Sequence, residues 1–328
     1  MRRLLSTILA VAGAILVPAT PAFAHAGDTT SVSDYRVTVS GLSNPLDGLT
    51  VRVVEGGARL ELSNDSGRTI EVLGYSGEPY LEVRPDGTYE NVNSPATYLN
   101  QTLGGETPIP PAADPTTAPT WRRLSGDTTV RWHDQRTRWA EPAPPPEVTA
   151  APDEPHRLRE WSVPLRDQVR TFEIQGTLDY EPPPTAWAWW LGSALLGLTV
   201  VLLARRCPRS AGPLAFLGGS ITWGYVVTTA LDGAGWAPVP ILAGLLAVAA
   251  VWRHPPFYLT LSGFILAAFA GFGSADVFFA AVVPSAGPTW FPRVAVACAI
   301  GVGAGLALTG VLRLRAAAPA PAPTPAPV

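Results

Sequence analysis

Five apolar stretches follow one another closely in the second half of this 328-residue chain. Each has about the 20 residues that a helix needs to cross the hydrocarbon core of a bilayer. They occupy residues 186–204, 213–231, 236–252, 256–273 and 294–312. Residues 25–184, which end in Pro182-Pro183-Pro184, contain no such stretch. We therefore expect a water-soluble domain (25–184) joined to a bundle of five transmembrane helices (185–315).

Charged residues orient the five predicted helices. Six of the seven arginines after residue 185 follow the first, third and fifth stretches, and such positive flanks stay on the cytoplasmic side. Asp232 and Asp276 fall at the opposite ends, where Arg293 is the exception. The sequence thus predicts a multi-pass protein of the cell membrane. Its N-terminal domain is expected to be extracytoplasmic, and its disordered Ala/Pro tail (316–328) cytoplasmic.

The first 24 residues have the pattern of a signal peptide. Arg2 and Arg3 precede an apolar run over 4–17, and Ala22-Phe23-Ala24 is an A-x-A cleavage site. Cleavage there makes His25 the new N-terminus, whereas the alternative, an uncleaved anchor, places the next domain on the same side. This domain holds 14 arginines and 24 acidic residues and no cysteine. An acidic domain disfavours nucleic acid as a partner, and one without disulfides depends on its hydrophobic core.

Alternating apolar and polar residues recur along the domain, and this period of two is typical of half-buried strands. Turn sequences such as Glu55-Gly56-Gly57 link the alternating segments. About eight short strands with tight turns predict an all-β sandwich of immunoglobulin-like type. The expected strands are 35–40, 49–54, 58–64, 69–73, 80–84, 128–133, 160–163 and 170–180.

A candidate metal site contains His25, His133 and Asp134. A free His25 terminus offers an α-amine and an imidazole, and nitrogen ligands in tetragonal geometry suit Cu(II). His133 and the adjacent Asp134 complete the site if the fold brings them near. The alternative is that His133 is a core histidine with a satisfied hydrogen bond and that the terminus is mobile.

Two further segments carry candidate binding groups. Four tyrosines lie within residues 73–100, and arginines alternate with tryptophans over 121–139. Tyrosine is common both at binding surfaces and in sandwich cores, and an Arg–Trp surface suits an anionic or sugar-like ligand or forms ordinary salt bridges. The chain has no G-x-S-x-G, H-E-x-x-H, P-loop or dinucleotide-binding motif, so we expect no enzyme.

The segments 73–100 and WHDQRTRW (132–139), followed by the multi-span half, resemble a family of uncharacterised actinobacterial membrane proteins. The layout is also similar to fusions of the periplasmic copper-binding CopC domain with the CopD membrane domain. A CopC-type mature chain begins with histidine, as His25 would here, but its D-x-H element is present only in reversed form, as His133-Asp134. The resemblance implies this architecture and, through the second family, copper handling.

The preferred interpretation is a membrane protein that displays the β-sandwich for ligand binding or cell-envelope assembly. Its partners are then the lipid bilayer and another envelope protein, in an oligomeric state left open. Copper homeostasis through His25 is the first alternative, and transport the second. Two details stay open: Gly301 and Gly305, at G-x-x-x-G spacing, suit packing within the bundle or dimerisation, and Asp276 is either functional or interfacial.

Overall fold

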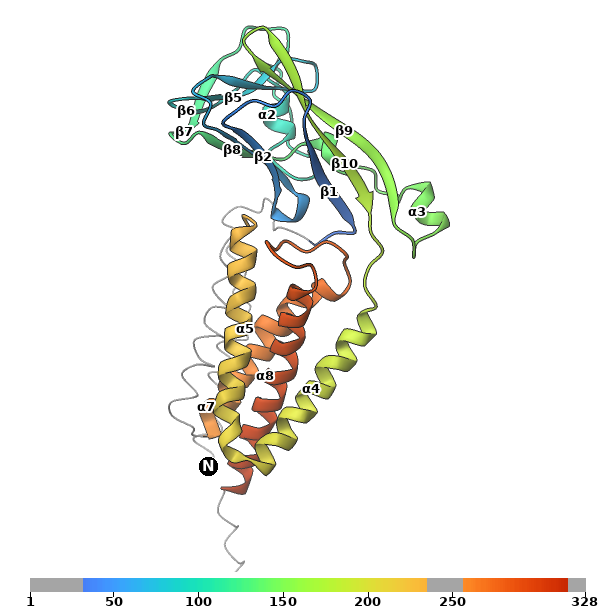
Figure 1. The fold of residues 1–328 in the computed structure, drawn as a ribbon, viewed down its shortest axis with the longest axis vertical. Coiled ribbons are helices and arrows are strands. Elements are labelled where there is room, and N and C mark those ends of the chain that lie inside the picture. The colour runs from blue at the N-terminus through green and yellow to red at the C-terminus, as the bar shows by residue number, and fades with distance from the viewer. Residues whose placement is uncertain (1–31, 235–255, 318–328) are drawn as a thin grey trace, which may run out of the picture.

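The computed structural model describes residues 32–234 and 256–317 (Figure 1). A β domain of ten strands in two sheets stands on one end of a group of helices, four of which are long and apolar enough to cross a membrane. The signal peptide, His25, the third predicted span (236–252) and most of the tail lie outside the described residues, so those predictions stay predictions.

The larger sheet has seven strands in the order β1-β10-β9-β4-β5-β6-β7, and the smaller has three in the order β2-β3-β8. All neighbouring strands are antiparallel. The strands are β1 (Tyr35–Leu42), β2 (Leu49–Val54), β3 (Arg59–Asn64), β4 (Ile70–Leu73), β5 (Pro79–Arg84), β6 (Gly87–Asn91), β7 (Trp121–Ser125), β8 (Thr129–Trp132), β9 (His156–Asp167) and β10 (Arg170–Tyr180).

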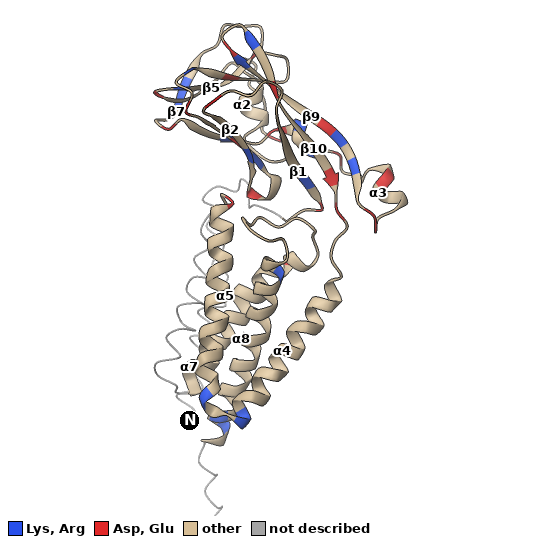
Figure 2. Cartoon of the chain, viewed as in Figure 1, with Lys and Arg blue, Asp and Glu red and all other residues tan. Residues whose placement is uncertain are grey.

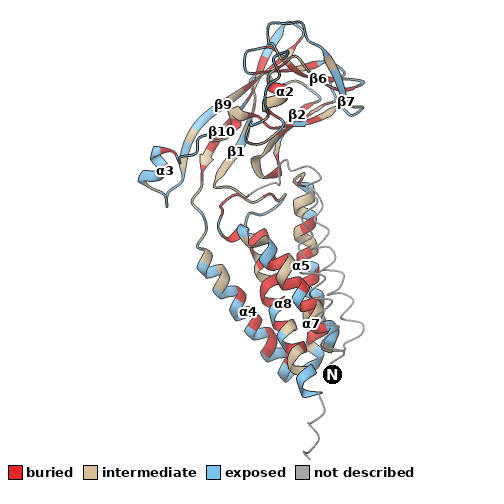
Figure 3. Cartoon of the chain, turned by 180° about the vertical axis from the view of Figure 1, so that it is seen from behind, coloured by how far each residue is buried: buried red, intermediate tan, exposed pale blue. Residues whose placement is uncertain are grey.

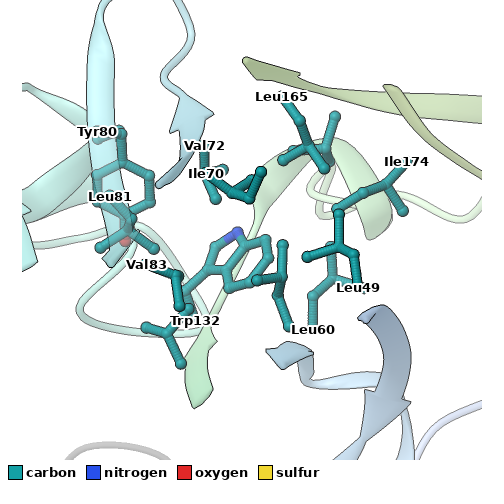
Figure 4. Close-up of a cluster of buried hydrophobic side chains, with 14 of the residues drawn as sticks. Leu49, Leu60, Ile70, Val72, Tyr80, Leu81, Val83, Trp132, Leu165 and Ile174 are labelled. Carbon is teal, nitrogen blue, oxygen red and sulfur yellow. The ribbon is translucent and has the colours of Figure 1, made fainter. Parts of the chain in front are cut away.

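The two sheets share one hydrophobic core (Figure 4). Alternate residues of the core strands point into it: Leu60 and Leu62 come from β3, and Ile174 and Leu178 from β10. Trp132 of β8 lies among side chains of both sheets and is almost fully buried. The period of two in the sequence is therefore the alternation of core and solvent faces, and the two-sheet β domain is confirmed.

All eight predicted strands are present, together with two that the sequence pattern does not predict. β6 reads GTYEN and β7 reads WRRLS, and neither shows the apolar alternation that marks a half-buried strand. Both lie toward the far edge of the larger sheet, where few core side chains are available to pack against. The short helices α2 (Ala96–Leu99) and α3 (Pro146–Ala150) are also not predicted, because four or five residues are too few to show a helical period.

Four of the five predicted spans are described. They are Ala186–Arg206 (α4), Pro208–Leu231 (η3, Pro208–Ser210, with α5, Ala211–Leu231), Pro256–Phe278 and Phe291–Ala316 (α8). The third of these is not a uniform α-helix: α7 (Pro256–Ile265) continues as a π-helical segment η4 (Leu266–Gly271) and a 3₁₀ segment η5 (Phe272–Phe278). This extension carries the span five residues beyond its predicted end.

Glycines let α4, α7 and η4 approach α8 closely. A Cβ atom on Gly305 would lie 2.7 Å from the Gly197 carbonyl oxygen of α4, and one on Gly301 would lie 2.7 Å from the Ser193 oxygen. Gly303 meets Gly263 and η4 on another side of the helix. The G-x-x-x-G pair is thus used for packing within the bundle, and α8 is its most buried described helix (Figure 3).

The basic ends of the helices lie together at the end away from the β domain (Figure 2). Arg205 and Arg206 are in the last turn of α4, Arg209 follows in η3, and Arg313 and Arg315 end α8. This arrangement agrees with the arginine pattern in the sequence.

Candidate functional site

A polar groove of about 430 Å³ lies on the larger sheet, where β1, β10 and β9 run side by side. Its lining side chains are small or neutral apart from one carboxylate. They are Ser40, Glu160, Ser162, Gln175 and Thr177, and the backbone at Gly176 and Trp161 contributes to the lining.

The strand register explains how these residues meet. Thr177 is paired with Glu160, and Gln175 with Ser162, so the four side chains project from the same face of the β10–β9 pair. The residues that flank them, such as Ile174 and Val163, are buried in the core on the other face. One sheet face thus completes the core, and the opposite face is lined by hydrogen-bonding groups.

Two local irregularities shape the groove. The pairing of β1 with β10 shifts between Val39 and Gly41, which leaves Ser40 as the extra residue of a β-bulge. On β10, a Cβ atom at Gly176 would lie 2.1 Å from Cζ2 of Trp161, so the indole ring occupies the place of a side chain. A glycine is needed here because any other residue would displace the ring from the core.

Most polar side chains of the groove do not bond to other parts of the fold. Within the described residues, the side chains of Ser40, Glu160, Ser162 and Gln175 make no hydrogen bond or ion pair. Other acids on these strands do: Asp179 pairs with Arg157, and Asp167 with Arg68. Since the lining holds no basic side chain, the groove suits a neutral or cationic ligand that is rich in hydroxyl or amide groups and disfavours phosphate.

The tyrosine segment and the Arg–Trp segment of the sequence meet in a separate cluster. The Gln135 N–H donates to the Tyr75 hydroxyl (2.9 Å), and the guanidinium of Arg136 lies 4.9 Å from the centre of the Tyr75 ring. Arg136 also donates to the Leu73 carbonyl (3.2 Å) and pairs with Asp134 (2.7 Å). Burial raises the pKa of the Tyr75 phenol, and the neighbouring Asp134 adds to the rise.

This cluster ties the loop before β5 to the turn after β8. Its groups are mostly paired with one another, as expected if these segments form ordinary internal contacts and not a binding surface. The exception is the Nδ2 amide of buried Asn100, which has no hydrogen-bond partner among the described residues. The tyrosine segment supplies another stack at the sheet edge, where the guanidinium of Arg84 lies 3.9 Å from the centre of the Tyr89 ring and 5.7 Å from that of Trp121.

The described members of the predicted copper site are buried and engaged. The Nδ1 atom of His133 is 2.7 Å from the Ala58 carbonyl oxygen, and its Nε2 accepts from Arg59 (3.0 Å). The carboxylate of Asp134 accepts from the Trp132 indole N–H (3.0 Å) and from Arg136. In the described part of the chain no three His, Cys, Asp or Glu residues are grouped as a metal site. Because His25 is not described, the copper site stays a prediction.

The β domain is joined to the helices by backbone hydrogen bonds. Ser33 and Val282 exchange two of them (3.0 and 2.7 Å), which makes a short antiparallel bridge between the start of the domain and the loop before α8. The carboxylate of Asp34 accepts from the Ala281 N–H (2.9 Å). The domain therefore contacts the membrane part directly as well as through its linker.

A second set of contacts lies at the end of α5, beside the turn η1 (Glu55–Gly57). The Glu55 N–H donates to the Asp232 carbonyl oxygen and the Gly56 N–H to its carboxylate, both at 2.8 Å. Burial raises the pKa of Asp232 and of Asp34. We call these two sets of contacts the joint; it consists of residues 33–34, 55–56, 232 and 281–284.

The surroundings of Arg293 explain why it departs from the arginine pattern. It lies near the start of α8 at the β-domain end and is only 8% exposed. Its guanidinium donates to four backbone carbonyls, those of Val277, Thr289, Ala280 and Ala281, at 2.7–3.1 Å. This arginine folds the loop that the joint uses and is not a solvated flanking charge.

Asp276 lies in η5 at the β-domain end of its span, and it is exposed. Its carboxylate accepts the N–H of the adjacent Val277 (3.1 Å). A position at the end of the span agrees with the interfacial alternative, and the role of Asp276 stays a prediction.

No protein-family model, no curated protein and no solved structure matches the chain. Any function assigned to this protein therefore rests on its own fold and on the geometry of its sites.

Proposed function

We propose that this is a multi-pass protein of the cell membrane whose extracytoplasmic β domain binds a polar component of the cell envelope. The observation that carries the proposal is the groove on β1, β10 and β9, where Ser40, Glu160, Ser162 and Gln175 present unpaired hydrogen-bonding groups. Ser162 is half-buried, whereas Ser40, Glu160 and Gln175 are exposed and face solvent. A hollow lined by polar groups that the fold does not use can exchange its water for the hydroxyl and amide groups of a ligand.

The chemistry of the lining points to the ligand class. The carboxylate accepts hydrogen bonds, and the carboxamide and three hydroxyls both donate and accept them. The hydroxyl and amide groups of an uncharged envelope glycan complement such a set. The domain is acidic overall, with 24 acidic residues and 14 arginines in residues 25–184, which further disfavours a polyanion.

The joint supports display in a fixed orientation. Direct hydrogen bonds to Ser33, Asp34, Glu55 and Gly56 restrain the domain against the ends of the helices. The arginines at the opposite helix ends are the reason for the proposed sidedness. We also propose that the two-sheet domain is of immunoglobulin-like type and that the span 236–252 is the fifth helix of the bundle.

Binding is tested with the full-length protein in lipid nanodiscs and purified cell-wall glycan as the probe, by co-sedimentation. Replacing Glu160 and Gln175 together by alanine removes two hydrogen-bonding groups, each contributing about 1 kcal/mol, and we expect roughly 30-fold weaker binding. Thr171→Ala is the control, because Thr171 is exposed on β10 outside the groove. Equal sedimentation of all three proteins contradicts glycan binding in the groove.

Sidedness is tested separately. Protease added to intact cells is expected to cut the β domain, and a reporter fused after Arg315 is expected to be active only inside the cell. A protected β domain or an external reporter would refute the orientation while leaving the groove intact.

A further inference from the structure

A second groove, of about 460 Å³, lies between the membrane helices α4 and α8. It runs along α4 from Trp190 to Val201 and along α8 from Ile300 to Leu308, with Phe272 of η5 also in its wall. Several lining residues are exposed on the outer surface of the bundle, among them Ala194 and Ala304. The groove therefore opens sideways into the region that the membrane occupies.

The packing of α4 creates this groove. The two helices touch where Gly197 meets Gly301 and Gly305, and α4 leans away from α8 toward its own N-terminal end (Figure 1). Small residues at the contact bring the helix backbones together, while the larger side chains on either side stand apart. The floor is thus formed by glycine and alanine, and the walls by Leu198, Val201 and Leu308.

Aromatic rings border the end of the groove nearest the β domain. Trp190 stacks on Phe272 with ring centres 5.6 Å apart, and the edge of Phe278 meets Trp190 at 5.4 Å. Phe272 directly follows the π-helical segment η4, and the extra residue of a π turn rotates the residues after it. Such turns are frequent at functional sites.

The lining is almost entirely hydrocarbon. No charged side chain contributes, and the single polar one, Ser193, donates its hydroxyl hydrogen to the Trp189 carbonyl of its own helix (2.8 Å). An occupant therefore finds no free polar side chain to bind, and its affinity must come from burial of apolar surface.

Length identifies the occupant. The eleven-residue advance from Trp190 to Val201 spans about 16 Å of helix, close to half of the ~30 Å hydrocarbon core. The acyl chains of one leaflet fill half of that core, whereas a transmembrane helix of a second copy crosses all of it. The groove therefore matches one acyl chain in length and is too short to seat a spanning helix.

We propose that this groove holds one acyl chain of a phospholipid from the leaflet nearest the β domain. The chain enters beside the tryptophans at the start of α4, where indole rings sit at the headgroup level, and its end lies near Val201 and Leu308. The site follows from the membrane helices alone and does not depend on the glycan ligand or on which side of the membrane the domain lies.

The test uses the full-length protein in nanodiscs of a phosphatidylglycerol that carries a photoactivatable diazirine in the middle of one acyl chain. After illumination, labelled residues are mapped by mass spectrometry. We expect label on the groove residues of α4 and α8 at least threefold above that on Leu195 and Leu202, which are exposed on other faces of α4. Even labelling around α4 overturns the proposal.

Ala194→Leu with Ala304→Leu fills the groove from its exposed side, and we expect groove labelling to fall at least threefold. Ala188→Leu is the matched control, since Ala188 is exposed on α4 and does not line the groove; its labelling pattern should equal that of the wild type. Each single leucine variant is measured as well, so that a folding defect in the double variant leaves the question decidable. Unchanged groove labelling in a folded filled variant also overturns the proposal.

Discussion

Replacing Asp232 by alanine tests whether the joint is held by that carboxylate. The Gly56 N–H donates to it (2.8 Å), and Gly56 also packs against Pro284. The variant leaves this N–H without its acceptor, and the loss of a hydrogen bond to a charged group costs about 1.5–3 kcal/mol. The neighbouring Glu55 N–H keeps its acceptor, because this is the backbone carbonyl of residue 232.

Hydrogen–deuterium exchange of the full-length protein in nanodiscs measures the effect, because a buried amide exchanges through local opening. At about 1.4 kcal/mol for each factor of ten, the Gly56 amide should exchange roughly 10- to 100-fold faster in Asp232→Ala. Asp276→Ala is the control, an exposed acid at the same end of the helices whose carboxylate accepts only a local N–H. A Gly56 amide that exchanges at the wild-type rate, or equal acceleration by both variants, would refute the reasoning.

Four other predictions concern particular residues. Burial raises the folded-state pKa of Asp232 above its ordinary 3.8, so the stability that this group contributes is fully present below 3.8 and is lost as pH rises through the raised pKa. The joint amides, corrected for intrinsic exchange, should therefore be better protected from exchange near pH 4 than at pH 7. Asp232→Asn should reduce that difference, and an unchanged pH profile in this variant would contradict the prediction. Gly56→Ala and Gly67→Ala both place a side chain at positive φ, which costs about 1–2 kcal/mol. Only the Cβ atom at residue 56 would meet Pro284, at 2.8 Å, so Gly56→Ala should lower the melting temperature more. Equal losses in the two variants would show that the Pro284 contact is unimportant. Gly305→Ala should lower the melting temperature, because its Cβ would lie 2.7 Å from the Gly197 oxygen. Gly192→Ala has open space around it and should raise helix stability by up to about 1 kcal/mol. Melting-temperature shifts of the same sign in both variants would count against close packing of α4 on α8. The copper hypothesis predicts tighter Cu(II) binding by a chain that begins at His25 than by one with an added Met before it, and equal affinities in a titration would remove it.

Local patterns carry most of the secondary structure. Strands such as β2, with Val51 and Val53 on one face, are readable because a period of two needs only neighbouring residues. The ends of the spans are less predictable: η4 and η5 continue the third described helix because of how it packs on α8, which no local window contains.

The groove and the joint could not be predicted, because both depend on residues far apart in the chain. The alternation in YRVTVS does place Ser40 on a polar face, but its approach to Gln175 requires the strand order β1-β10-β9. In the sequence Asp232 is only a flanking charge, and the fold brings it to Gly56, 176 residues earlier. In the sequence His133 is either a metal ligand or a core histidine with a satisfied hydrogen bond, and in the fold it is buried beside β3 and contacts the Ala58 carbonyl.

The chain leaves the β domain along β10, crosses Pro182-Pro183-Pro184 and continues directly into α4. Arg36 of β1 pairs with Glu181 at the start of this crossing, with one of its contacts at 2.7 Å. Strand β10 forms part of the polar groove, and α4 forms one wall of the apolar groove. A force on a ligand in the first groove would therefore reach the helices by two routes, the joint and the semi-rigid three-proline linker. The first helix on the second route is α4, which forms a wall of the apolar groove.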